Sequence, residues 1–413
     1  MYRDIQPKEI IVDLMRIVFV TYHYWPPHFG GELKVSIERF ESLVRRGHSV
    51  TVLTSGVPGL PGEEVINGIQ VKRSPILHDS RFGRGLRRLA FPIWAWLQMR
   101  RMEFDILHHG GIGGIDPLTN RLGMDLLNKL THRKGSRSVW VHSLADSEEI
   151  AFGEIGFNGR MRNKALESVD TIVSVSPALH EGVERVFPGK SRLIPYGIHD
   201  DLFTPLSQEE KVHFRNKNQI CDDEVVFSFL GSVGKRKGFD LLIRAFADAI
   251  RKHPNWRLWI IGPHNKQESQ NFEDEGIEEM LESLKGAREQ VHFWGRIDDR
   301  TEMATILGAS DVFVFPSRKE GMGIAPLEAM ACGIPAIISS IPGITDQASI
   351  EGKTGRYIEV NNAEALKTAM AELSNDPELR EEMGKAARRR IVEQFGWKKH
   401  IDDWEALYTL QRK

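Results

Sequence analysis

Short apolar runs alternate with amphipathic stretches along most of the chain, a pattern typical of α/β domains built on parallel sheets. The first run, Arg16–Thr21, is rich in β-branched residues and leads into a loop, Tyr22–Gly31. A helical period follows, with Leu33, Ile37 and Phe40 on one face. The same alternation predicts further strands at His48–Thr54, Ile69–Arg73, Phe104–His108, Ser138–His142 and Thr171–Val175.

A second alternating stretch begins at the apolar run Val225–Leu230, which precedes a glycine-rich loop and a helix predicted over Leu241–Ile250. Strands are predicted next at Arg257–Ile261, Gln290–Phe293, Val312–Phe315 and Ile334–Ser339, with a helix around Pro326–Ala331. Beyond Asn361 the pattern is helical only, and it predicts helices over Ala363–Leu373, over Glu378–Phe395 and from Trp397 onward.

The segment between the two stretches, Ile194–Pro205, contains prolines, a glycine and paired aspartates, which indicate a linker. We therefore expect two Rossmann-like domains with doubly wound parallel sheets, residues 1–200 and 201–396. The helix over residues 397–413 is expected to pack back on the first domain. Such sheets bind ligands outside the carboxyl ends of their strands, so we expect the site in a cleft where the domains face each other.

Composition narrows the function classes. The 413 residues carry 55 Lys and Arg against 57 Asp and Glu, a formal net charge of −2, which argues against a nucleic-acid binder. Two cysteines, Cys221 and Cys332, are too few for a disulfide framework or a structural zinc site, and we expect both as buried thiols. Asp4, Glu9 and Asp13 interrupt any signal-peptide core, so the sequence predicts a cytoplasmic protein.

One segment keeps a membrane question open. Arg84–Arg101 is apolar and aromatic, with arginines at both ends, and its apolar run Leu89–Leu97 is too short to cross a bilayer. A basic helix with tryptophans can lie among anionic headgroups at the inner membrane face. The favoured interpretation is a packed surface helix whose arginines face solvent, with peripheral membrane contact as the alternative.

Candidate chemistry concentrates after the strand predicted at Val312–Phe315. Gly321 and Gly323 let the backbone pass close to a ligand, and their N–H groups form a phosphate cradle together with a helix N-terminus. Glu328, expected in the first helical turn, either accepts ribose hydroxyls or only complements the helix dipole. Glu320 precedes the cradle, where it can face a sugar or a developing positive charge.

Three other segments are weaker candidates when taken alone. Gly231–Gly238 is a glycine-rich turn with lysines and an arginine, suited to a diphosphate, although a solvated basic loop has the same pattern. His142 ends a predicted strand, with His108 and His109 as weaker histidine candidates, and single histidines are more often structural. The aromatic loop after the first strand either packs or offers ring faces to an acceptor, through Tyr22, His23 and Trp25.

Glu320 and Glu328, separated by seven residues and followed by Ala329–Pro335, resemble the signature of retaining glycosyltransferases of family 4, which have the two-domain GT-B fold. The resemblance runs from about Arg16 to the C-terminus. It is carried also by Met15–Thr21 with Gly30 and Gly31, Arg45–Thr54, Phe104–His108, Val173–Leu179, Phe293–Arg296, Asp311–Ser317 and Phe395–Lys398.

The resemblance implies roles for individual residues. It assigns catalysis to Glu320, His142 and Lys237, with His142 against the donor sugar, and it implies neither a bound metal nor a cofactor. Ser232 departs from the family pattern, which has an arginine there as one of two cations on the donor phosphates. Either Lys235 or Arg236 replaces that cation, or the donor pocket differs from the family pattern. Donor contacts are implied for Gly31, Gly231, Ser232, Lys237, Arg296, Gly321, Met322, Gly323, Ile324 and Glu328.

The predicted function is therefore transfer of a sugar from a UDP- or GDP-linked donor to a hydroxyl of a glycan, lipid-linked or small-molecule acceptor. Retention of the anomeric configuration through a same-face mechanism is implied, because no second suitable carboxylate is evident in the N-terminal half. Two alternatives stay open, a nucleotide-sugar epimerase and a non-catalytic nucleotide-sugar-binding protein. A dinucleotide-dependent dehydrogenase is disfavoured, since no Gly-x-Gly-x-x-Gly follows the first strand.

Overall fold

The computed structural model describes residues 14–24, 31–75, 81–110, 117–142, 163–264, 277–282 and 284–412. The chain forms two compact units. The first comprises Met1–Val141, Glu154–Val173 and Ile401–Lys413, and the second comprises His142–Gly153 and Ser174–His400. Domain boundaries at residues 200 and 396 remain a prediction.

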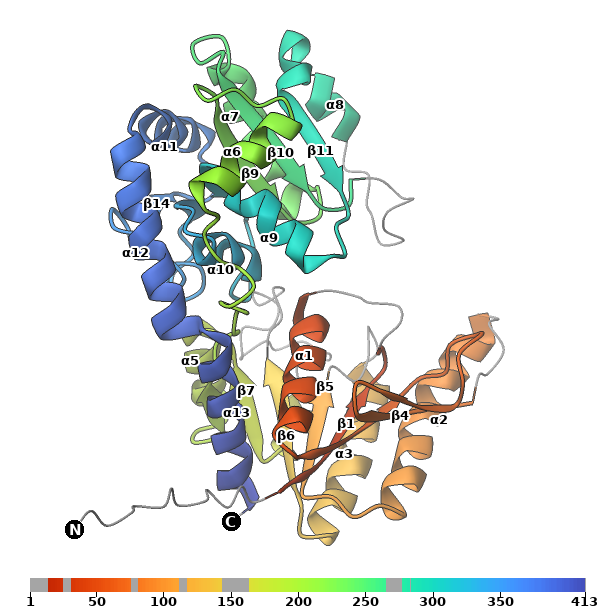
Figure 1. Ribbon diagram of the computed structural model, residues 1–413. Helices are drawn as coiled ribbons and strands as arrows, with labels where there is room; N and C mark the ends of the chain where they lie inside the picture. The colour runs from red at the N-terminus through yellow and green to blue at the C-terminus, as the bar shows by residue number, and fades with distance from the viewer. Residues whose placement is uncertain are drawn as a thin grey trace, which may run out of the picture. The chain divides into compact units, whose positions relative to one another are not determined.

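The first sheet has eight strands in the order β3-β4-β2-β1-β5-β6-β7-β8 (Figure 1). Pairing is parallel from β4 through β2, β1 and β5 to β6, and β3 is antiparallel to β4. The strands are β1 (Arg16–Thr21), β2 (Ser49–Thr54), β3 (Glu63–Ile66), β4 (Ile69–Arg73), β5 (Ile106–Gly110), β6 (Arg137–His142), β7 (Thr171–Ser174) and β8 (Ser191–Leu193). The helices that alternate with them are α1 (Gly31–Arg45), α2 (Arg81–Arg100), α3 (Pro117–Arg133) and α5 (Pro177–Val186).

Strand β3 was not among the predicted elements, although the sequence signals it. Asn67 and Gly68 both have positive φ, 48° and 83°, and they join β3 to β4 as a two-residue turn. An Asn-Gly pair between short apolar runs is the strongest local signal for such a hairpin, because this turn needs two left-handed residues. The hairpin adds an antiparallel edge to an otherwise parallel sheet.

The second sheet is parallel throughout, in the order β11-β10-β9-β12-β13-β14. Its strands are β9 (Val225–Leu230), β10 (Trp256–Ile261), β11 (Val291–Gly295), β12 (Val312–Phe315), β13 (Ala336–Ser339) and β14 (Gly355–Ile358). The helices of this part are α6 (Gln208–Lys217), α7 (Phe239–Ala249), α8 (Ile277–Glu282), α9 (Arg300–Gly308), α10 (Ile324–Ala331), α11 (Ala363–Asn375) and α12 (Pro377–Phe395), and α13 (Trp397–Arg412) follows. The predicted α/β fold with two parallel-sheet domains is thereby confirmed.

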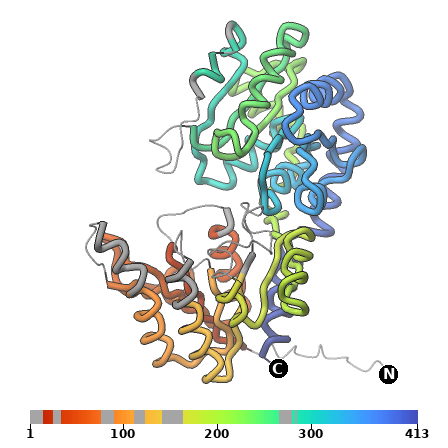
Figure 2. Tube along the Cα trace, turned by 180° about the vertical axis from the view of Figure 1, so that it is seen from behind, coloured from red at the N-terminus to blue at the C-terminus, as the bar shows by residue number. Residues whose placement is uncertain are grey.

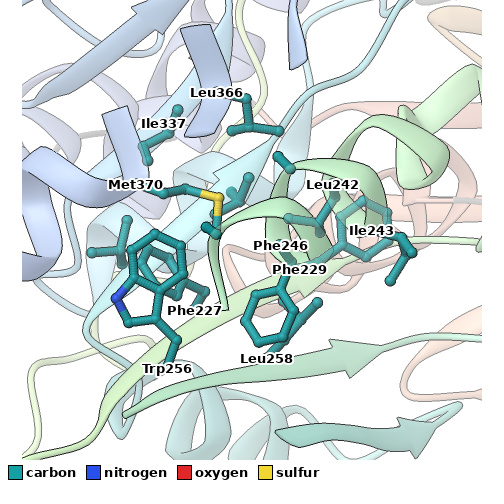
Figure 3. Close-up of a cluster of buried hydrophobic side chains, with 14 of the residues drawn as sticks. Phe227, Phe229, Leu242, Ile243, Phe246, Trp256, Leu258, Ile337, Leu366 and Met370 are labelled. Atoms are coloured by element: carbon teal, nitrogen blue, oxygen red, sulfur yellow. The ribbon is translucent and has the colours of Figure 1, made fainter. Parts of the chain in front are cut away.

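One apolar cluster holds the second sheet to α7 and α11 (Figure 3). Phe227 and Phe229 lie two residues apart on β9 and therefore point to the same face of the sheet. Phe246 of α7 and Met370 of α11 pack against that face, and all four of these side chains are completely buried. This packing fixes the strand that leads into the glycine-rich loop after Leu230.

Helix α13 completes the first unit. Its Trp404 and Tyr408 are buried, and the Arg39 guanidinium lies 3.9 Å from the centroid of the Trp404 ring. Arg46 donates to Asp402 and Glu405, and His48 Nε2 lies 2.8 Å from Glu405 Oε1. Residues from the end of the chain therefore supply apolar and charged partners for side chains near its beginning.

His108 and His109, on β5, belong to the core of the first unit. Both are fully buried, His108 Nδ1 lies 2.7 Å from the Tyr408 hydroxyl, and His109 Nε2 lies 2.8 Å from Asn128 Oδ1. Burial lowers the pKa of His109 to about 4 despite the bond to Asn128. Burial, with the charges of Arg39 and His109, also holds the pKa of His108 well below its usual value. Both rings are neutral at pH 7 and serve packing.

These two histidines should make the protein sensitive to acid. An unfolded histidine titrates at about 6.5, so between that pH and about 4 the unfolded chain binds protons that the folded chain does not. Above about pH 6.5 these histidines therefore do not lower the free energy of unfolding. Below that pH the free energy of unfolding decreases, by about 3 kcal/mol at pH 4 for His109 alone. Urea unfolding between pH 7 and pH 4 measures this loss. In His109→Gln the decline should be smaller, and in the exposed control His213→Gln it should match wild type. An unchanged decline in His109→Gln would contradict the assignment.

Helix α2 contains the apolar run that raised the membrane question, and α2 and α3 pack side by side (Figure 2). Among the side chains described, Phe91, Ala95 and Met99 are buried, while Ile93 and Leu97 are exposed. No helix in the described ranges is long and apolar enough to span a bilayer.

The expectation of two buried thiols is half wrong. Cys332 is buried at the end of α10, and burial raises the pKa of its thiol. Cys221 is exposed in the turn before β9, because that turn lies outside the packed sheet.

Candidate functional site

The second sheet brings most of the predicted donor residues to one edge. Its strands are parallel, so their carboxyl ends meet there. The loop after β9 carries Gly231, Ser232 and Lys237, and the loop after β12 carries Glu320 and the residues up to Gly323. These loops lead into α7 and α10, respectively.

Glu320 is the centre of a charged cluster at this edge. Glu320 is 6% exposed, and one of its carboxylate oxygens, Oε1, accepts from Lys237 Nζ at 2.6 Å and from Ser317 Oγ at 2.6 Å. Arg236 Nη1 lies 3.6 Å from the same oxygen. Lys237 Nζ also lies 5.2 Å from the centroid of the Phe315 ring. A lysine and a buried carboxylate are thus held side by side, in a position to act on opposite charges of one ligand.

The two loops are fixed to each other by backbone and side-chain contacts. Gly238 has φ +71°, and a Cβ on it would lie 1.9 Å from the carbonyl oxygen of Pro316. Arg318 N donates to Arg236 O at 2.9 Å, and the Arg318 guanidinium donates to both carboxylate oxygens of Asp240 at 2.6 and 2.8 Å. Only glycine fits at position 238, because both the conformation and the close approach exclude a side chain.

The turn predicted to form a phosphate cradle directly precedes α10, and the structure corrects the predicted start of this helix. Gly323, with φ +84°, is the N-cap of α10, so the helix begins at Ile324 instead of Pro326. Glu328 therefore lies beyond the first turn, where a carboxylate no longer complements the helix dipole effectively. The helix dipole therefore does not explain Glu328. Met322 is buried before the cap, and its sulfur accepts from Tyr196 N at 3.4 Å.

Glu328 is buried and paired with a cation that the sequence interpretation missed. Its Oε1 accepts from Arg300 Nη2 at 3.0 Å, and the Arg300 guanidinium lies 5.0 Å from the centroid of the Phe203 ring. Arg300 is the first residue of α9, directly after the N-cap Asp299. No local motif marks this arginine, because its partner is 28 residues further along the chain. Ser317, the other unpredicted member of the site, directly follows Pro316 after β12.

The remaining predicted donor residues of this sheet lie nearer to solvent. Ser232 is exposed in the loop after β9, and Gly231 N donates to Ile261 O of β10. Arg296 follows β11, is 43% exposed in its side chain, and donates through Nε to Asp298 at 2.9 Å. The structure thus groups the predicted donor residues of this half of the chain at the carboxyl edge of one sheet.

The other predicted residues belong to the first sheet. His142 ends β6 and Gly31 begins α1, while Tyr22 and His23 directly follow β1. The Tyr22 ring lies 4.7 Å from the Phe91 ring, centroid to centroid, and burial lowers the pKa of His23. Trp25 lies outside the described residues. Within the ranges described, no group of three or more His, Cys, Asp or Glu side chains could hold a metal ion.

Comparisons with known proteins agree with this architecture. Residues 210–390 match the family profile described as Glycosyl transferases group 1, and residues 30–202 match Glycosyltransferase Family 4. An uncharacterized glycosyltransferase of Methanocaldococcus jannaschii is 30% identical over 93% of this chain and 95% of its own. A GDP-mannose-dependent alpha-(1-6)-phosphatidylinositol monomannoside mannosyltransferase of Mycolicibacterium smegmatis is 26% identical over 91% of this chain and 93% of its own.

Solved structures agree on the fold. HepE of Anabaena, in complex with UDP-glucose, superimposes with a TM-score of 0.74 and 15% identity over 97% of this chain and 100% of its own. The two parallel-sheet domains thus have the GT-B arrangement of elements. The architecture, both family profiles and the full-length relative together place this chain in the group 1, family 4 glycosyltransferases.

Proposed function

We propose that this glycosyltransferase moves a sugar from a UDP- or GDP-linked donor to an acceptor hydroxyl, with retention of configuration and without a metal ion. The observation that carries the proposal is the cluster of Lys237, Ser317 and Glu320 next to the N-terminus of α10. Breaking the bond between the sugar and the diphosphate creates positive charge on the sugar and negative charge on the leaving group. In this cluster Glu320 can stabilise the positive charge, and Lys237 can stabilise the negative charge.

The negative charge of the leaving diphosphate suits Lys237 and the start of α10. The first N–H groups of a helix lack intrahelical acceptors, so those of Gly323 and Ile324 are available to phosphate oxygens. Groups that are already oriented toward developing charge lower the barrier without reorganising during the reaction. Lys237 would exchange its bond to Glu320 for bonds to the diphosphate when the donor binds.

Glu320 and His142 are assigned to the sugar. The buried Glu320 carboxylate can offset the positive charge that develops on the ring and accept its hydroxyls. A double displacement would need a second carboxylate about 5 Å from the first. We instead propose a same-face mechanism in which the departing phosphate takes the proton of the acceptor hydroxyl.

Glu328 is proposed to bind the ribose of the donor. Arg300 donates to one of its oxygens and holds the side chain in place. The Mycolicibacterium relative is named for GDP-mannose and HepE was solved with UDP-glucose, so both bases are represented among the similar proteins. We propose a cytoplasmic enzyme whose acceptor approaches the aromatic residues Tyr22 and His23, with α2 available for contact with a lipid-linked acceptor.

A thermal-shift panel of UDP, GDP, ADP and their common sugar conjugates tests the donor site. A nucleotide present at 100 times its dissociation constant should stabilise the fold by about 2.7 kcal/mol. We expect one nucleotide family to do so in wild type and to lose most of the effect in Glu328→Ala. The exposed control Glu302→Ala, on the helix that carries Arg300, should respond like wild type.

Two results would redirect the assignment. Stabilisation by none of these nucleotides would mean that Ser232 marks a lost donor site, as in a non-catalytic binding protein. Conversion of the nucleotide sugar without any acceptor present would identify an epimerase.

A further inference from the structure

A cavity lies at the edge of the same sheet that is opposite the candidate donor site. It has a volume of about 880 Å³ and is lined by α6, α12, the residues before β12 and the loop after α10, all in the second unit. Asp311 immediately precedes β12, whereas Glu320 follows that strand. Because β12 is a single parallel strand, the cavity and the candidate donor site are at its two ends.

The cavity is rich in charge. Five basic and three acidic side chains line it. Asp311 is already engaged, because Lys211 Nζ and Arg215 Nη1 both lie 2.9 Å from its carboxylate and Val226 N donates to it at 2.8 Å. Glu381 pairs with Lys385 one turn further along α12. The structure therefore neutralises part of the basic lining from within.

Two arginines of the lining donate their described hydrogen bonds to backbone carbonyl oxygens. Arg380 donates through Nη1 to the carbonyl oxygens of Leu373 and Ser374, at 2.6 and 2.8 Å. Arg388 donates to the carbonyl oxygens of Asp200, Phe203 and Ala331, at 2.7, 2.7 and 3.0 Å.

No described carboxylate forms an ion pair with either arginine. Burial lowers the pKa of Arg380. The charges of Asp311 and, to a smaller extent, Asp376 oppose this effect, the charge of Arg215 adds to it, and the net result is a lowered pKa. An anion in the cavity would reverse that effect.

We propose that this cavity binds a small molecule through a phosphoryl group held by Arg380. Within the described ranges the hydrogen bonds of Arg380 use Nη1, which leaves its Nε and Nη2 edge for a second interaction. A guanidinium binds phosphate through two parallel hydrogen bonds, and a half-buried one does so with little competition from water. Cavities of about 300–1,000 Å³ are of the size that holds small metabolites.

The rest of the lining can receive the body of such a ligand. Pro205, Ile334 and Pro335 supply apolar surface beside the charged groups. An occupant would contact the loop that ends α10, the helix whose first turn forms the phosphate cradle at the other edge of the sheet. The proposed site is therefore distinct in position and in residues from the donor site.

Isothermal titration calorimetry with inorganic phosphate and ribose 5-phosphate tests the proposal, with unphosphorylated ribose as the blank. Wild type should bind at least one of the two phosphates. The dissociation constant should rise at least tenfold in Arg380→Gln and stay within twofold of wild type in Lys237→Ala, which alters only the donor loop. Tighter binding of ribose 5-phosphate would identify a phosphate ester as the ligand, and equal binding would identify free phosphate.

A second variant covers the case in which Arg380→Gln unfolds through loss of its carbonyl contacts. Val212→Trp places a large ring on α6 at the cavity wall, keeps every arginine and should abolish binding. The proposal fails if wild type binds neither phosphate. It fails equally if binding survives in Arg380→Gln and in Val212→Trp but is lost in Lys237→Ala.

Discussion

Lys237→Ala is expected to lower kcat about 100- to 1,000-fold. Removing one preoriented group that stabilises transition-state charge typically has an effect of that size. The lysine lies 2.6 Å from Glu320, so its loss leaves the leaving diphosphate with the helix N-terminus alone and leaves a buried carboxylate with fewer donors. Sugar transfer from the donor identified by the nucleotide panel measures the effect. KM should change less than kcat, since the interaction strengthens as the bond breaks.

The matched control is Lys252→Ala, a change to an exposed lysine in the turn between α7 and β10. It removes the same charge from the same unit, and activity should stay within twofold of wild type. If both variants retained full activity, another group of the loop would have to stabilise the diphosphate. Arg236→Ala would then be the next variant to test.

Asp311→Asn should have the largest effect on stability, a loss of about 3–5 kcal/mol. Burial alone would raise the pKa of Asp311, but Lys211, Arg215 and the N–H of Val226 lower it, so the carboxylate is charged in the fold. The amide keeps the size of the side chain but leaves two cations without their counter-charge. Removing one partner of a buried charged group costs far more than the net contribution of the intact group.

Urea unfolding at pH 7 measures this loss, and Glu364→Gln is the control. Glu364 pairs with Lys367 on the solvent face of α11 and is 75% exposed, so its replacement should cost less than about 1 kcal/mol. Equal losses in the two variants would show that Asp311 contributes no more than a surface ion pair.

The sequence predicted helices and strands well where the spacing of apolar residues and the length of the apolar run indicated the same kind of element. Val225–Leu230 and Val312–Phe315 are strands with the predicted bounds, because fully buried parallel strands appear as short continuous apolar runs. The start of α10 was misplaced by two residues. A proline in the first turn is a common signal, but Gly323, which can adopt positive φ, ends the loop earlier.

Long-range partners could not be predicted in the same way. The order of glycines and glutamates in the chain pointed to the region around Glu320, because a glycine-containing turn before a helix is a local sequence signal. Arg300 and the Asp311 cluster depend on which strand ends and helices become neighbours. That information is in the topology of the sheet and not in any short motif.

The contribution of α13 to the first unit has a consequence for how the protein is made. The partners of Arg39, Arg46 and His48 are on α13, and the ribosome reaches that helix only after the whole second unit has been synthesised. Domains of a nascent chain usually fold in order from the N-terminus. Here the first unit must wait with an incomplete core while the second can fold, so the nascent N-terminal half depends for longer on protection from aggregation.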